Sequence, residues 1–284
     1  MADTPSPPTF ASCGHADLHM PEPMILSPAS AAQLLLYIIS NHTYPLTLVV
    51  GSTKEEFLRV LVRHVEASRV QKIVGTQAMN AHPLLAASLF QIAVAKHIRL
   101  LFTPTVSHLR AYLSVFSPLD SKVSSPPVYN EAAASAGSRW LVVYGMFNIH
   151  RNTSEWNSQG IMSSLSVLVD AASRAGFRPV IVEPHPEDPS IEEDADATTP
   201  GEADRDYDAQ DYLQKIRAEQ VPLLGYKQSS DVHLSKRSVS LGRVAERWFH
   251  YFRMQWSEET NAGDGEIERE YTSQENLAMT QADE

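Results

Sequence analysis

The chain has a single cysteine, Cys13, and no apolar run that approaches the ~20 residues of a membrane-spanning helix. One cysteine excludes a disulfide framework and any zinc site made of several cysteines, which suits a reducing compartment. The first ten residues, MADTPSPPTF, contain neither a basic residue nor an apolar stretch, so we expect no secretory signal. We therefore expect an intracellular protein of the nucleus or the cytoplasm, with no membrane partner.

Signatures of common enzymes are also missing. The sequence contains no GxSxG element, no HExxH element and no cysteine paired with a histidine. Serine hydrolases and zinc proteases depend on such elements for their nucleophile or their metal. We expect neither a metal ion nor another cofactor.

Basic residues are in the minority, and charge is unevenly distributed. The chain contains 34 Asp and Glu against 23 Lys and Arg, a net charge of −11. Residues 185–220 hold 12 acidic and 3 basic residues, and residues 257–284 hold 9 and 1. The rest therefore has 13 acidic and 19 basic residues, or +6. The pattern indicates either an anion-binding body with two acidic appendages or simply two solvated acidic loops.

Segments with the pattern of strands alternate with segments that have the period of helices. The expected strands are 46–50, 98–102, 140–146 and 178–183, with a short one at 70–74, and the expected helices are 31–40, 54–68, 83–96, 105–116 and 159–175. Such alternation is typical of an α/β domain whose central sheet is mostly parallel and flanked by helices. The nearly continuous apolar run WLVVYGM indicates a strand buried on both faces.

The composition predicts one domain with disordered ends. We expect a disordered Pro/Ser/Ala-rich segment over 1–28, the α/β domain over 29–256 and a disordered acidic tail over 257–284. Within the domain we expect a linker at 117–137 and an acidic insertion at 185–220.

The first candidate site is Gly51-Ser52-Thr53-Lys54, which follows an expected strand and precedes an expected helix. A phosphate cradle of the GxxxxGK[ST] type needs several backbone N–H groups, a lysine and a hydroxyl group for Mg²⁺. This loop has one glycine, and Glu55 follows the lysine. We favour a degenerate loop in which Ser52 and Glu55 cap the helix, and a weak nucleotide site is the alternative.

The second candidate is the loop after the strand at 140–146, where parallel sheets usually place ligands. His150, Arg151 and Glu155 in this loop are candidates for contact with a ligand or a partner. The alternative is a connection made of turn-forming residues. Tyr144 stands where an ATP-binding α/β domain would carry a magnesium-binding aspartate, which disfavours catalysis.

The third candidate lies near the carboxyl end, where residues 236–253 combine five basic residues and one acidic residue with four aromatic ones. The candidates for contact with nucleic-acid phosphates are Lys236, Arg237, Arg243 and Arg247. We also expect helical spacing to place Val244, Trp248 and Phe252 on a common face. The alternative is an ordinary edge helix with aromatic core residues and solvated arginines.

The region 46–183 resembles the RecA-like core of recombinase paralogues. TLVVGSTKEEFLRVLV stands where that family has a strand, a phosphate loop and a helix, and IRLLFTPTVSHLRAYLSVF is similar to the strand and helix that precede its second nucleotide motif. RWLVVYGMFNIHRNTSEWNSQGIMSSLSVLVDAASRAGFRPVIVE is similar to the aspartate-bearing strand, its loop, a long helix and the next strand. The GKT-type signature is missing, and Tyr144 or Gly145 replaces the acidic residue.

The resemblance implies a pseudo-ATPase that forms a hetero-oligomer with a related RecA-like protein. Shu-complex-type recombination mediators and the RecA-like subunits of Elongator are degenerate relatives of this kind. We expect a non-catalytic accessory subunit that assists DNA recombination and repair through protein partners, with DNA contact as a further expectation. The alternatives are a P-loop-like ATPase that uses Ser52, Thr53 and Lys54, and an RNA-linked scaffold subunit of the Elongator type.

Overall fold

The computed structural model describes most of the central part of the chain. The described residues are 22–41, 44–74, 82–86, 88–120, 123–124, 139–185, 209–223, 237–254, 256 and 267–269, and side chains are described for all of these except 67–74, 209–211 and 267–269. The strands are β1 Met24–Ala29, β2 Leu46–Val50, β3 Ile98–Phe102, β4 Trp140–Tyr144, β5 Arg178–Pro184, β6 Gln220–Pro222, β7 Ser238–Ser240, β8 His250–Met254 and β9 Ile267–Arg269. The helices are α1 Ala31–Asn41, α2 Lys54–Val74, α3 Leu89–Ala95, α4 Val106–Ser114, α5 Ser158–Ala175, α6 Ala209–Ala218 and α7 Leu241–Ala245, with short 3₁₀ turns η1 Pro118–Asp120 and η3 Asn148–His150.

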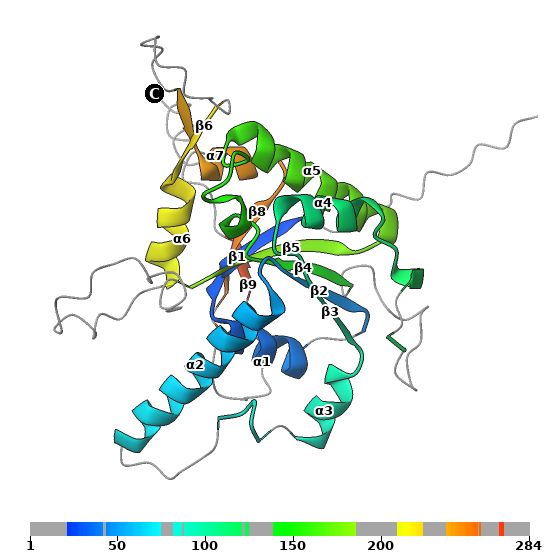
Figure 1. The fold of residues 1–284 in the computed structure, drawn as a ribbon, viewed down its shortest axis with the longest axis vertical. Helices are drawn as coiled ribbons and strands as arrows, with labels where there is room; N and C mark the ends of the chain where they lie inside the picture. Colours follow the sequence, from blue (N-terminus) through cyan, green and yellow to red (C-terminus); the bar gives the residue numbers. More distant parts are fainter. Residues whose placement is uncertain are drawn as a thin grey trace, which may run out of the picture.

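A seven-stranded sheet in the order β3-β2-β4-β5-β1-β8-β9 forms the centre of the domain. Its first six strands are parallel to one another, and β9 runs antiparallel to β8. Strands β6 and β7 form a separate antiparallel pair. The predicted α/β architecture with a mostly parallel central sheet is therefore confirmed (Figure 1).

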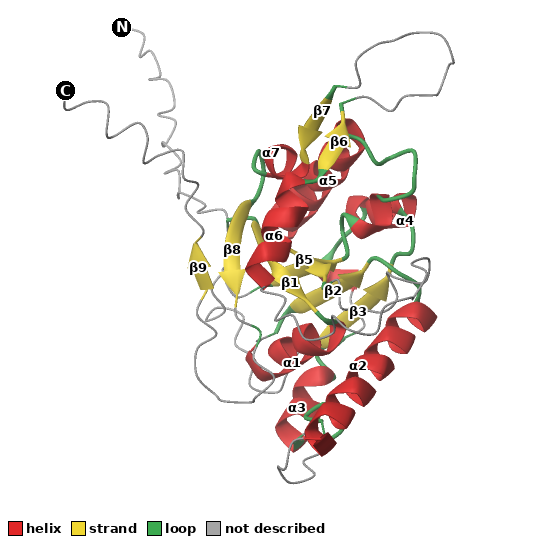
Figure 2. Ribbon diagram, turned by 90° about the vertical axis from the view of Figure 1, so that its left-hand side faces the viewer, coloured by secondary structure: helices red, strands yellow, loops and turns green. Residues whose placement is uncertain are grey.

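Helices cover both faces of this sheet, because successive side chains of a strand point to opposite faces. On one face, Val49, Val143 and Ile181 pack with residues of α4, α5, α6 and α7. On the other, Leu48 and Val142 pack with α1 and α2. Figure 2 shows α1, α2 and α3 together on this second side of the sheet. No helix in the described part of the chain has both the length and the apolarity needed to cross a bilayer.

Strand β1 lies inside the segment that we expected to be disordered. It pairs with β5 on one side and β8 on the other, and all six of its residues are buried. The expectation of disorder is thus wrong for Met24–Pro28, while residues 1–21 lie outside the described residues. The short apolar run stands among Pro21, Pro23 and Pro28, so its composition suggests a loop, and the two neighbouring strands supply its stability.

Several predicted elements have the bounds that the structure shows, and others differ. The strands at 46–50 and 98–102 and the helix ending before Gly176 are confirmed. Helix α2 continues to Val74, so residues 70–74 are helical and the short strand expected there is wrong. The long buried helix expected at 83–96 is wrong, because α3 has seven residues and none of them is buried.

The acidic insertion is narrower than expected. Helix α6 and strand β6 belong to the domain, since Leu213, Ile216 and Val221 are buried in the core. Residues 186–208 lie outside the described residues, and so do residues 121–122 and 125–137 of the expected linker. The acidic tail includes β9, which pairs with β8, so the expectation of disorder is wrong at residues 267–269.

A substitution in β1 tests whether this strand is part of the core. Ile25 is 1% exposed, and Ile25→Ala should lower the free energy of unfolding by about 2–5 kcal/mol through lost burial and a residual cavity. Val115 is 71% exposed, and Val115→Ala should change it by less than about 0.5 kcal/mol. Urea unfolding followed by circular dichroism measures both, and equal effects would contradict the placement of β1.

Candidate functional site at the carboxyl ends of the strands

The order of the strands creates a crevice where helices leave the sheet in opposite directions. Helices α1 and α2, which follow β1 and β2, cover one face, while α5 and α6, which follow β4 and β5, cover the other. Since β2 lies beside β4 and β5 beside β1, the connections diverge at both places. Parallel sheets bind ligands at such switch points, outside the carboxyl ends of the strands. This crevice is therefore the candidate functional site.

The crevice holds only a small cavity. It is lined by Ala31, Val50, Gly51, Ser52, Glu56, Phe57, Val60, Tyr144, Gly145, Asn148 and Pro184. Its volume of about 30 Å³ accommodates water, whereas small-molecule pockets have ~300 Å³ or more. Among the described residues, no group of three His, Cys, Asp or Glu side chains is arranged to hold a metal ion. The described residues at this crevice therefore enclose much less space than a small-molecule pocket.

Gly51 is needed because β2 and β4 end in close contact. Its N–H donates to the Tyr144 carbonyl oxygen at 2.8 Å. A Cβ atom on Gly51 would lie 2.7 Å from the Gly145 carbonyl oxygen and 2.7 Å from Cγ2 of Ile149. Any side chain would therefore push the two strand ends apart. The glycine serves the packing of the sheet, which accounts for its presence without a phosphate ligand.

The remaining residues of the degenerate loop begin α2. The Thr53 hydroxyl oxygen accepts a hydrogen bond from the Glu56 N–H at 3.1 Å, so Thr53 caps the helix in place of the expected Ser52. The Ser52 hydroxyl donates to the Thr53 carbonyl oxygen at 3.3 Å. Lys54 is exposed and does not line the cavity. The cap of α2 is therefore Thr53, one residue after the cap that we expected at Ser52.

Tyr144 occupies the wall of the crevice at the end of β4. Its side chain is buried, and its hydroxyl donates to the Ala29 carbonyl oxygen at 3.1 Å. Its ring meets the ring of Phe57 edge-on, with centroids 6.2 Å apart. The residue therefore joins β4 to the end of β1 and to α2. An ATP-binding α/β domain would carry a magnesium-binding carboxylate at this position, whereas Tyr144 forms a structural hydrogen bond.

Glu183, at the end of β5, binds the turn that follows β4. One carboxylate oxygen accepts the Phe147 N–H at 2.8 Å, and the other accepts the Asn148 N–H at 3.2 Å. The side chain is 2% exposed. Burial raises the pKa of Glu183 to about 7, against the opposing effects of Arg151 and of the two N–H donors. An internal carboxylate thus takes the backbone donors that begin this turn.

His150 is buried, with both of its ring nitrogens in hydrogen bonds. Nδ1 lies 2.8 Å from the Met146 carbonyl oxygen, and Nε2 lies 3.0 Å from the Ser164 hydroxyl. Because a carbonyl only accepts, Nδ1 carries the proton. Burial lowers the pKa of His150, so the ring is held in its neutral form. The expected contact of His150 with a ligand or partner is incompatible with this burial.

Arg151 and Glu155 form ion pairs within the chain. The Arg151 guanidinium donates to both carboxylate oxygens of Glu219, at 3.3 and 2.7 Å, and lies over the Trp156 ring at 5.5 Å. Glu155 accepts a hydrogen bond from Arg110 at 2.9 Å. The polar groups of this loop therefore fix its shape, and we assign them no ligand.

The basic candidates lie apart from the crevice. Arg237, Arg243 and Arg247 are exposed, while Lys236 lies outside the described residues. Arg243 is in α7, and Arg247 is in the turn that follows, 3.9 Å from the sulfur of Met162. The structure thus brings the loop at 51–54 and the loop after β4 together at the carboxyl edge of the sheet. The basic residues near the carboxyl end lie elsewhere, on the face covered by α5 and α7.

The expected helical face of Val244, Trp248 and Phe252 is wrong. Helix α7 ends at Ala245, and Phe252 belongs to strand β8. Trp248 is 39% exposed, whereas its neighbour Phe249 is fully buried. The prediction applied helical spacing to the whole of residues 244–252, although the last part of this segment belongs to β8, where side chains alternate between two faces.

The sequence analysis missed Glu183 as a site residue. Its one sequence signal is a carboxylate at the end of the apolar run VIVE, where a strand buried on both faces reaches the sheet edge. Its partners are backbone groups of another segment, which no side-chain pattern reveals.

Comparisons with known proteins assign no family. No protein-family model matches the chain, and no curated protein matches it. A solved structure described as that of a DnaB-like replicative helicase and its interactions with primase is similar, with a TM-score of 0.35 and 10% sequence identity. The match covers 86% of this chain and 50% of that one, so the chain spans about half the length of that protein. The class defined by the fold is an α/β protein with six parallel strands and helices on both faces.

The buried carboxyl of Glu183 predicts a pH-dependent stability. Its pKa in the folded state, about 7, lies above the ordinary value of 4.5, so its favourable contribution to stability is complete below about pH 4.5 and is lost as pH rises through about 7. The stability of the wild type relative to Glu183→Gln should therefore fall between about pH 5 and pH 8, by on the order of 3 kcal/mol at most.

Urea unfolding at a series of pH values measures this difference. Glu66→Gln, at an exposed glutamate of α2, is the matched control and should keep a constant difference from the wild type. A difference for Glu183→Gln that stayed constant or grew with pH would contradict the assignment.

Proposed function

We propose that this chain is a non-catalytic α/β accessory subunit of RecA-like type that works through protein partners. The observation that supports it most is the closed crevice, where about 30 Å³ remains at the point where parallel sheets bind ligands. Gly51, Tyr144 and Glu183 make this closure part of the fold, since each joins two strand ends or a strand end and a turn.

The electrostatics of the crevice support the same proposal. A nucleoside triphosphate needs N–H donors, cationic side chains or a metal ion to balance its charge. Here Glu56 lines the cavity, and Glu183 takes the donors of the turn after β4. Lys54 lies outside the lining. The alternative of a P-loop-like ATPase is therefore the less well supported one.

The role in DNA recombination and repair rests on the sequence resemblance of 46–183 to recombinase paralogues. The same resemblance implies that the chain forms a hetero-oligomer with a related RecA-like protein. Exposed Arg237, Arg243 and Arg247 are suitable for contact with phosphates. Near them, Glu246 forms an ion pair with Arg217 at 2.8 Å, so this carboxylate has a cationic partner of its own.

Nucleotide binding tests the central part of the proposal. Fluorescent ATP, titrated with the full chain with and without Mg²⁺, should show no saturable binding tighter than about 1 mM, because the cavity is small and is lined by the Glu56 carboxylate and by no cationic side chain. An active P-loop ATPase in the same buffer serves as the positive control. A Kd in the micromolar range would overturn the proposal.

A salt titration tests the contact with DNA. If Arg243 and Arg247 each contact a phosphate, Arg243→Glu with Arg247→Glu should weaken binding and reduce the slope of log K against log salt by about 0.9 per lost contact on duplex DNA. Arg59→Glu, a single charge reversal on α2 at the opposite face, should alter neither. Unchanged affinity and slope in the double variant would remove these arginines from the proposal, and tighter binding to RNA would favour the Elongator-type alternative.

A further inference from the structure

Helix α3 is an apolar helix that buries none of its residues. Its sequence is LFQIAVA, and Leu89, Phe90 and Ile92 are 86%, 67% and 46% exposed. Helices this short are unstable alone in water, and helices apolar on all sides are normally buried. A capping box between Ser88 and Gln91 holds its first turn. The folding of the domain gives no reason for so much exposed apolar surface at this position.

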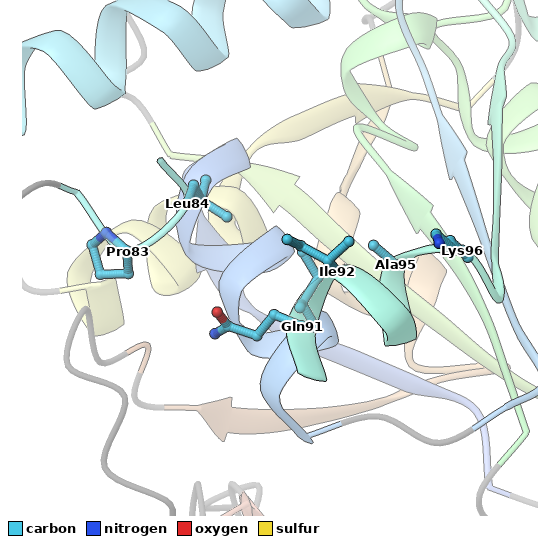
Figure 3. Close-up of a pocket in the computed structure, with 7 residues that line it drawn as sticks. Pro83, Leu84, Gln91, Ile92, Ala95 and Lys96 are labelled. Carbon is cyan, nitrogen blue, oxygen red and sulfur yellow. The ribbon is translucent and has the colours of Figure 1, made fainter. Parts of the chain in front are cut away.

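A groove of about 400 Å³ lies beside this helix. It is lined by Ile39 of α1 and by Pro83, Leu84, Gln91, Ile92, Ala95 and Lys96. Figure 3 shows Gln91, Ile92 and Ala95 along α3, with Pro83 and Leu84 on the segment that precedes it. The volume is within the ~300–1,000 Å³ of ligand pockets, and here the walls are almost wholly apolar. The groove has room for several apolar side chains of a bound segment.

Other apolar side chains of this part of the domain are exposed as well. Leu85 is 60% exposed, and Leu58 and Val62 of α2 are 44% and 52% exposed. Helices α2 and α3 both contact α1, so these side chains belong to one layer of the domain. We call the groove together with Leu85, Leu89, Phe90 and Ile92 the α1–α3 surface. Contiguous exposed apolar patches of this kind mark interaction sites.

The charge of this region indicates what binds there. Helices α1 and α3 contain no charged residue, and the residues that line the groove include one cation, Lys96, and no carboxylate. Lys96 lines the end of the groove and forms no ion pair with any described residue. A segment with acidic side chains beside its apolar ones would be attracted, whereas a basic segment would meet like charge.

We propose that the α1–α3 surface binds an amphipathic segment of a partner protein, apolar on one face and acidic on the other. Its apolar side chains occupy the groove and cover Leu89 and Phe90, and its carboxylates face Lys96. This is the helix-in-groove mode of peptide recognition. The inference rests on the proposed function in one respect, since a non-catalytic subunit acts through contacts of this kind.

A pair of synthetic peptides tests the chemistry of the partner on the wild-type chain. Both carry the same leucine stripe and a fluorescein label, and their polar faces consist of glutamate in one and lysine in the other. Fluorescence anisotropy against the full-length protein should give a Kd for the acidic peptide at least about tenfold lower than for the basic peptide. Equal binding, preference for the basic peptide, or no binding of either would overturn the proposal.

Substitutions test the location. Leu89→Ser with Phe90→Ser should raise the Kd of the acidic peptide at least about tenfold, and Lys96→Glu should reduce the preference for it by a similar factor. Leu119→Ser, at a leucine that is 92% exposed outside the groove, is the matched control and should leave the Kd unchanged. Far-UV circular dichroism checks the fold of each variant. An unchanged Kd in the folded double variant would place the binding elsewhere.

Two other occupants are distinguished by further measurements. Displacement of the probe at micromolar concentration by a peptide of residues 270–284 would assign the surface to the chain's own acidic tail. A dimer in sedimentation that Leu89→Ser dissolves would assign it to a second copy. Either result overturns the proposal. Fluorescent ATP in the same samples keeps the two proposals separate, since nucleotide binding with intact peptide binding would overturn only the proposed function.

Discussion

The structure depends on the close contact of four strand ends at the carboxyl edge of the sheet. Backbone hydrogen bonds run across this edge from Thr103 to Val50, from Gly51 to Tyr144 and from Gly145 to Val182, at 2.8 to 2.9 Å. The contact requires glycine at residue 51, where a Cβ would meet backbone at 2.7 Å, and at Gly145, where φ is +80°. Because Gly51, Thr103 and Gly145, each just after a strand, still form hydrogen bonds between neighbouring strands, little space is left for a ligand.

The same edge explains how the loops of this domain are held. Glu183 binds two N–H groups of the turn after β4, and Arg151 in that loop binds Glu219, just after α6. The loop, β5 and α6 are thereby linked through charged groups that are largely removed from water. In such surroundings each charge is costly unless its partners remain, so the groups constrain one another. This network gives Arg151 and Glu183 a structural reason to be charged.

Local signals predicted part of this architecture. The strands at 46–50 and 98–102 follow from apolar β-rich runs with clear boundaries, and the end of α5 follows from Gly176 in the left-handed conformation. Strand β1 could not be recognised, because its pairing with β5 and β8 is a tertiary property and prolines surround it. In the candidate site, the residue types of the loop 51–54 indicated the start of a helix, and Thr53 caps that helix. The role of the Glu183 carboxylate was not predicted, since its partners are main-chain groups distant in sequence.

Helix α3 differs from its neighbours α1 and α2 in that it does not cover the sheet. Helices α1 and α2 supply the side chains that cover this face of the sheet, so the core is complete without α3. Helix α3 packs mainly on α1, outside that layer, where it adds exposed leucine and phenylalanine to the surface (Figure 2). Exposed apolar area of this kind adds nothing to folding and increases the risk of aggregation, which polar residues at the same positions would avoid. A partner that removes this area from water would account for the apolar sequence, and a groove lined by Lys96 and by no carboxylate would account for an acidic face on that partner.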